Sequence, residues 1–105
     1  MKITFNKNEY SSYKDFYKDV LKKLNSKRFL DWEDETDLGY NGNLLGEFLW
    51  YCSQDNNEYI FINFYREKMQ PQKNQEDKEW EIIFYYFEKL TNDYPNNTLV
   101  FIDNL

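Results

Sequence analysis

Histidine and alanine are absent from this chain of 105 residues, and cysteine occurs once, at Cys52. Without histidine the chain lacks the commonest general base, the histidine-dependent catalytic triads and the usual zinc ligands. A single cysteine cannot form an internal disulfide and has no histidine to activate it, so we interpret Cys52 as a core residue in a reducing compartment. These absences predict a protein that is not an enzyme and that binds neither a metal ion nor a cofactor.

Glycine is also scarce, with only Gly39, Gly42 and Gly46 in the chain. Their spacing, without a lysine nearby, matches no phosphate-binding loop. The acids from Asp31 to Asp37 do not follow the spacing of a calcium-binding EF-hand loop either. Gly46 falls inside a predicted helix, where glycine costs about 1 kcal/mol relative to alanine. We therefore expect another group to approach the backbone of Gly46 closely.

Long apolar runs are missing as well. None approaches the roughly 20 residues that a membrane-spanning helix needs. Residues 1–25 alternate charged and aromatic side chains, unlike the apolar centre of a secretory signal. We therefore expect a cytoplasmic protein that makes no contact with a membrane. The length is typical of one hydrophobic core, so residues 1–105 are predicted to form a single domain.

Hydrophobic periodicity predicts alternating strands and helices. Apolar positions between Tyr13 and Leu24 recur every three or four residues, as in an amphipathic helix, and Ser12 with Asp15 resembles a capping box. The run 59–65 is bulky at nearly every position, which is typical of a central strand covered by helices on each side. The predicted order is strand 1–6, helix 13–24, loop 26–41, helix 43–53, strand 59–65, helix 77–92 and strand 98–103.

This order predicts the fold class. Parallel strands need crossover connections, and helices usually supply them. We therefore predict an α/β fold with a small three-stranded, mostly parallel sheet packed by three to four helices.

The net charge of −6 is unevenly distributed along the chain. Residues 1–30 carry a net charge of +5, and residues 31–105 carry −11. Between Asp31 and Tyr65 there are eight acids and no lysine or arginine. Such an electrostatic field repels nucleic acid and favours a basic partner.

The acids are densest in DWEDETDLGYNGN, residues 31–43, where aromatic residues lie among them. Acidic side chains accelerate the approach of a basic protein, and the rings of Trp32 and Tyr40 can anchor it. This pattern predicts a partner-binding loop. Two structural alternatives remain open: a solvated acidic loop, and rings that pack beneath it.

Five stretches cover most of the chain: SYKDFYKDVLKKL, GYNGNLLGEFLWYC, EYIFINFYREKMQ, EWEIIFYYFEKLTND and TLVFID. In order and periodicity they resemble the barstar family of ribonuclease inhibitors. The resemblance implies a three-stranded parallel α/β domain that plugs the active site of a secreted, basic ribonuclease with carboxylates.

The sequence departs from the barstar pattern at the two inhibitory aspartates. One alignment places Gly46 and Trp50 at these positions, and another places Tyr51 at the second of them. Glu47 is the nearest acid. Glu81 aligns with a glutamate that the family uses in contact with its target. If the inhibitory function is retained, the loop 31–43 must carry the charge.

These patterns lead to the hypothesis of a bacterial immunity protein. It would be a cytoplasmic antitoxin, monomeric until it forms a heterodimer with a basic toxin of the nuclease class. One alternative is an inhibitor that mimics nucleic acid and blocks a DNA-binding effector; another is a non-catalytic interaction module. Direct binding to nucleic acid is not expected. The predicted partner-binding residues are Asp31, Trp32, Glu33, Asp34, Glu35, Asp37, Tyr40, Glu47, Trp50 and Glu81.

Overall fold

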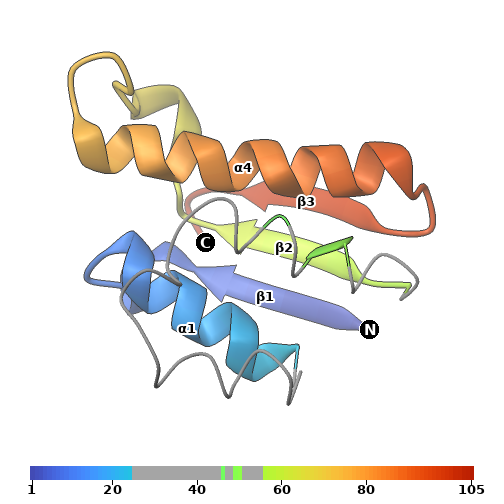
Figure 1. Cartoon of the computed structure of the whole chain (residues 1–105). Coiled ribbons are helices and arrows are strands. Elements are labelled where there is room, and N and C mark those ends of the chain that lie inside the picture. The colour runs from blue at the N-terminus through green and yellow to red at the C-terminus, as the bar shows by residue number, and fades with distance from the viewer. Residues whose placement is uncertain (25–45, 47–48, 51–55) are drawn as a thin grey trace, which may run out of the picture.

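Three parallel strands form a sheet in the order β1-β2-β3 (Figure 1). The computed structural model describes residues 1–24, 46, 49–50 and 56–105. The elements are β1 (Lys2–Asn6), the 3₁₀ helix η1 (Lys7–Glu9), α1 (Tyr13–Lys23), β2 (Glu58–Ile62), the 3₁₀ helix η3 (Arg66–Lys68), α4 (Gln75–Asp93) and β3 (Thr98–Ile102). The α/β class and the three-stranded parallel sheet predicted from the sequence are confirmed.

The predicted helix 43–53 and loop 26–41 lie largely or wholly outside the described residues. Of that helix, Gly46, Leu49 and Trp50 are described, and all three have helical backbone.

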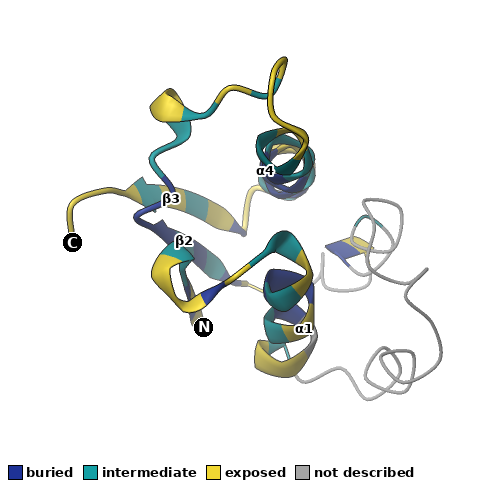
Figure 2. Cartoon of the chain, turned by 90° about the vertical axis from the view of Figure 1, so that its left-hand side faces the viewer, coloured by how far each residue is buried: buried dark blue, intermediate teal, exposed yellow. Residues whose placement is uncertain are grey.

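Helices α1 and α4 pack on the same face of the sheet (Figure 2). The ring of Phe61 on β2 lies 5.9 Å from Phe16 of α1 and 5.0 Å from Phe87 of α4, between ring centroids. Because neighbouring residues of a strand point to opposite faces, Ile60 and its register partner Val100 face away from both helices. No helix among the described residues covers that second face.

The prediction that helices would cover the central strand on each side is therefore wrong for the described part of the chain. The reason is the direction of the two crossovers. Both connections, β1 to β2 and β2 to β3, move one strand in the same direction along the sheet. Connections between parallel strands are right-handed. Two such connections that run in the same direction along the sheet therefore place their helices on the same face of it.

Aromatic rings dominate the core between this face and the helices. Phe61 and Phe84 are fully buried, and their rings meet edge to face with centroids 5.9 Å apart. Such edge-to-face pairs add to the free energy of burial. The buried cluster consists of Ile3, Phe5, Tyr10, Phe16, Tyr17, Val20, Leu49, Tyr59, Phe61, Phe64, Trp80, Ile83, Phe84, Phe87 and Leu90.

The start of α1 is capped differently from the prediction. Ser12 makes no side-chain capping bond, so the predicted capping box is wrong. Asp15 instead accepts a hydrogen bond from the Ser11 N–H at 3.0 Å. The Tyr13 N–H donates to Glu76 Oε1 of α4, also at 3.0 Å. The free N–H groups of the first turn are thus satisfied partly by another helix.

The central strand ends earlier than the predicted run 59–65. β2 stops at Ile62, and Asn63 and Tyr65 have φ values of 59° and 50°, in the left-handed region. The Asn63 amide and the backbone of Leu105 bond to each other in both directions, at 3.0 Å each. The chain therefore turns away from the sheet at Asn63, although the sequence stays apolar.

Tyr10 supports a prediction about alkaline pH. Its hydroxyl donates to Asp19, which also pairs with Lys23 at 2.9 Å. Burial, and then the hydrogen bond to Asp19, raise the pKa of Tyr10 above its usual value. The pKa of Tyr10 is therefore higher in the folded state than in the unfolded state. Its contribution to the free energy of unfolding is fully present below the unfolded pKa of about 10 and is lost as the pH rises above that value.

We therefore expect the difference in free energy of unfolding between wild type and Tyr10→Phe to be constant up to about pH 10. Above that pH it should shrink. Urea unfolding on both sides of pH 10 measures the difference, and a constant value throughout would contradict the prediction.

Candidate partner-binding surface

Two of the ten predicted contact residues, Trp50 and Glu81, belong to the described part of the chain. The other eight lie outside the described residues: Asp31, Trp32, Glu33, Asp34, Glu35, Asp37, Tyr40 and Glu47. Glu81 belongs to α4, whereas Trp50 lies at a groove that residues of α4 help to line.

Trp50 lies beside an apolar groove. The side chain exposes 61% of its surface, whereas the neighbouring Leu49 exposes 2%. The groove has a volume of about 180 Å³, and its lining includes Trp50 together with Tyr86 and Leu90 of α4. Large exposed rings beside an apolar hollow are common at the centre of protein interfaces. This groove can therefore accept an apolar side chain from a partner.

Gly46 and Tyr86, which both line the groove, lie close to each other. A Cβ atom built on Gly46 would lie 2.7 Å from Tyr86 Cε1 and 3.1 Å from Tyr86 Cδ1. Both distances are shorter than ordinary contacts between carbon atoms. The expected close approach at Gly46 is confirmed, and the approaching group is the ring of Tyr86.

The rim of the groove carries both signs of charge. Lys89 and Asp93 line it and form an ion pair at 3.3 Å, one helical turn apart. Exposed pairs of this type contribute little to stability. Both side chains are therefore available to rearrange around a bound partner.

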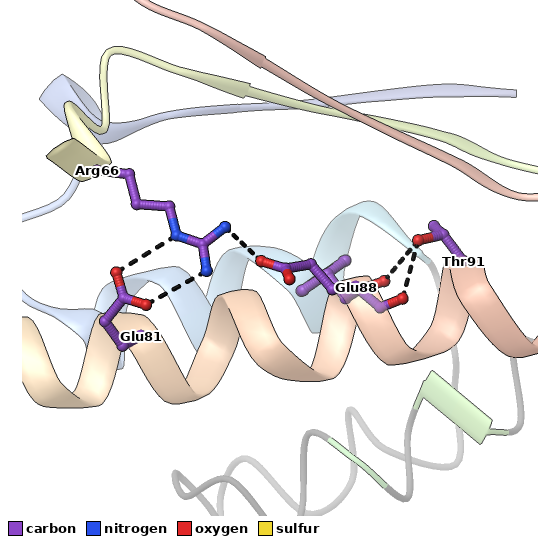
Figure 3. A network of polar contacts seen from close by, with 5 residues as sticks. Arg66, Glu81, Glu88 and Thr91 are labelled. Carbon is purple, nitrogen blue, oxygen red and sulfur yellow. Dashed lines mark hydrogen bonds and ion pairs between the residues drawn. The ribbon is translucent and has the colours of Figure 1, made fainter.

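Glu81 belongs to a cluster with Arg66 and Glu88, which we call the Arg66 cluster (Figure 3). Arg66 Nε donates to Glu81 Oε1 at 3.3 Å, and Nη2 donates to Glu81 Oε2 at the same distance. Nη1 of Arg66 pairs with Glu88. Glu88 follows Glu81 by seven positions, about two helical turns, so the two glutamates project from one side of α4. Partial burial lowers the pKa of Arg66, but the hydrogen bonds to Glu81 and Glu88 outweigh it and raise that pKa overall.

Arg66 also covers two rings of the core. Its guanidinium lies 5.0 Å from the ring centroid of Phe84 and 5.4 Å from that of Phe101. These distances fit cation–π contacts. Arg66 therefore links η3 to α4 and β3. No sequence pattern predicts this pairing, because Arg66 and Glu81 belong to different elements.

The Arg66 cluster gives a stability prediction. Arg66→Met leaves Glu81 and Glu88 without their counter-charge, and we expect a loss of about 1 to 2 kcal/mol, since the group is partly exposed and screened. Arg66→Lys should recover less than half of this, because an ammonium cannot reproduce the two-pronged contact. Urea unfolding measures both variants. Lys68→Met, on the same 3₁₀ helix, is the matched control; an equal loss there would contradict the prediction.

Metal ligands do not gather in the described part of the chain: no group of three histidine, cysteine, aspartate or glutamate side chains there could hold a metal ion. Over the same residues, no helix is long and apolar enough to cross a membrane.

Comparison with models of known protein families gives no match, and comparison with curated protein sequences gives none either. The resemblance to barstar therefore rests on the sequence stretches quoted above, and on the parallel sheet that it implies.

Proposed function

We propose that this protein is an immunity protein that binds a basic toxin of the nuclease class and occludes its active site. The observation that carries the proposal is the charge distribution: eight acids and no lysine or arginine between Asp31 and Tyr65. Crowded carboxylates repel one another, and a basic surface relieves that repulsion on binding.

The acids of residues 31–37 would take the place of substrate phosphates against lysine and arginine side chains of the toxin. Glu47 would add a further carboxylate. Charge pairs of this kind raise the association rate and weaken as salt is added. The complex should therefore be tightest at low ionic strength.

Aromatic side chains would supply the apolar part of the contact. Trp50 is exposed beside the groove, which supports its role as an anchor. Trp32 and Tyr40 would add two further rings next to the acids. Anchors of this type usually contribute more binding free energy than charges at the rim of an interface.

Glu81 would have a smaller role than the loop acids. Its carboxylate already bonds to Arg66 through both oxygens. A cation of the toxin would have to share that carboxylate with Arg66. We therefore assign Glu81 to the flank of the interface, where neutralising it has a small effect on binding.

The first experiment identifies the partner. The tagged protein is retrieved from its host cell at low salt, and retained proteins are identified by mass spectrometry. The proposal expects a basic nuclease whose activity this protein blocks. Retention of no basic protein would refute the proposal, and retention of a DNA-binding effector would support the nucleic-acid-mimic alternative.

The second experiment tests the acidic loop with two variants that change the net charge equally. The loop variant is Glu33→Gln, Asp34→Asn and Glu35→Gln. The control variant is Glu9→Gln, Glu67→Gln and Glu79→Gln. We expect the loop variant to lose on the order of 100-fold in affinity for the retained nuclease at low salt, and the control less than about tenfold. Equal losses would show that net charge matters and the loop does not.

A further inference from the structure

β3 lies at one edge of the sheet, and no described segment pairs with its outer side (Figure 1). The Thr98 N–H and the Ile102 carbonyl both bond to the β2 side, at 2.9 and 2.8 Å. In a parallel pair, alternate residues direct both backbone groups to the same neighbour. The N–H and carbonyl groups of Leu99 and Phe101 therefore point outward, along the free edge.

The opposite edge of the sheet is protected. Lys23 Nζ of α1 donates to the outward carbonyl of Thr4 on β1 at 2.5 Å, and β1 itself carries Lys2. Lysine side chains at an edge prevent pairing with another chain. The β3 sequence TLVFI contains no charge, proline or glycine, so it has none of these protective features. The two edges of the sheet therefore differ in their capacity to pair.

Exposed apolar side chains are concentrated around β3. Val100 and Ile102 each expose 37% of their surface, and Leu105, just beyond the strand, exposes 76%. Tyr85, with 59% exposed, lies on the flank of α4 that carries the Arg66 cluster. Among the described residues these are four of the six large hydrophobic side chains that are exposed. The free edge is therefore bordered by apolar surface.

We propose that β3 pairs with β3 of a second copy, antiparallel, about a two-fold axis at Val100. Leu99 of each copy then exchanges backbone hydrogen bonds with Phe101 of the other, and the two Val100 residues face each other. Two three-stranded sheets become one continuous sheet of six strands. A closed two-fold contact of this kind uses the same surface on both copies.

Charge argues for a second copy as the occupant. In a chain of net charge −6, TLVFI is an uncharged stretch, so self-pairing places no like charges opposite each other. The Arg66 cluster at the rim carries both signs. The remaining repulsion acts between the two whole molecules and is screened by salt. The dimer should therefore tighten as salt is added, whereas the toxin complex should weaken.

The dimer and the proposed toxin contact use different flanks of α4. Tyr86 and Leu90 line the groove with Trp50. Glu81 and Glu88 instead pair with Arg66, whose guanidinium lies over the ring of Phe101 on β3. Residues at these spacings project from different sides of a helix. The proposed dimer therefore leaves the groove open, and it differs from the monomer expected from the sequence.

Sedimentation equilibrium tests the dimer, from about 1 μM to about 1 mM protein and at about 50 and about 500 mM NaCl. We expect the mass to double with concentration, at lower concentrations in the higher salt. Val100→Lys places two like charges opposite each other and should raise the dimer Kd at least about tenfold. Thr4→Lys is the matched control, because Thr4 and Val100 flank Ile60 at the same level of the sheet. It should leave the Kd unchanged.

Cross-linking provides a second, independent test. In Val100→Cys the two introduced thiols face each other across the axis, and oxidation should join them as a disulfide. Thr4→Cys should link no more than the wild type, whose single Cys52 sets the background. Three results would overturn the proposal: a wild type that stays monomeric throughout, equal weakening by the two lysine variants, or equal cross-linking by the two cysteine variants.

Discussion

Phe61→Ala is expected to destabilise the protein by about 3 to 5 kcal/mol, a large share of the stability of a domain of this size. Phe61 is fully buried on the central strand. Its ring contacts Phe5 of β1, Phe16 of α1 and Phe84 of α4, with centroids 5.3, 5.9 and 5.9 Å away. Alanine would leave a cavity where four elements meet. Fixed side chains around it could close that cavity only in part.

Ile60→Ala is the matched control for this prediction. Ile60 is the preceding residue of the same strand, but it faces the side of the sheet that no described helix covers. Its truncation should cost about 1 kcal/mol, since less apolar surface is buried there. Urea unfolding followed by circular dichroism measures both variants. A cost for Phe61→Ala no larger than that for Ile60→Ala would contradict the one-sided packing of the sheet.

Asn63→Ala is expected to cost about 2 to 4 kcal/mol, because it removes two features at once. The side-chain amide makes two hydrogen bonds to the backbone of Leu105. The backbone has a φ of 59°, which asparagine tolerates better than alanine. Asn63 is also 94% buried, so both hydrogen bonds are made by a side chain that is itself shielded from water. Thermal and urea unfolding both measure the loss.

Two further variants separate these contributions. Asn63→Gly removes the amide but adopts a positive φ without strain, so it should be about 1 kcal/mol more stable than Asn63→Ala. Deletion of Leu105 removes the hydrogen bonds and keeps the asparagine. Equal stability of the glycine and alanine variants would exclude a contribution from the backbone conformation. A deletion without cost would exclude one from the hydrogen bonds.

Periodicity was a reliable guide to the helices and the sheet. The predicted helix 13–24 corresponds to α1 (Tyr13–Lys23), and the predicted helix 77–92 corresponds to α4 (Gln75–Asp93). Both have a buried stripe at the spacing of a helix, which depends only on local sequence. The end of β2 was not predictable in this way. Phe64 is buried beyond it, so an apolar pattern continues through a turn set by Asn63.

The candidate site was predictable to a smaller degree. Glycine is unfavourable inside a helix, so its presence at position 46 indicated that a contact from elsewhere in the fold requires it. The close approach of Tyr86 to Gly46 confirms this. The pairing of Glu81 with Arg66 could not be foreseen, since it depends on where η3 and α4 meet in space. The packing of both helices on one face of the sheet depends on the direction in which the two crossovers run along the sheet, and composition does not encode that direction. The role of the acidic residues 31–37 in binding a partner remains a prediction.

The capping of α1 by Glu76 has a consequence for the order of events during synthesis. An isolated helix of 11 residues is marginal in water, and α1 obtains one of its capping bonds from a residue 63 positions later. Within the part of the chain that the structure describes, β1 likewise pairs only with β2, more than fifty residues downstream. Neither element can complete its contacts while the chain is still emerging from the ribosome. The N-terminal quarter of the protein must therefore wait for the C-terminal half, so the fold closes only late in translation.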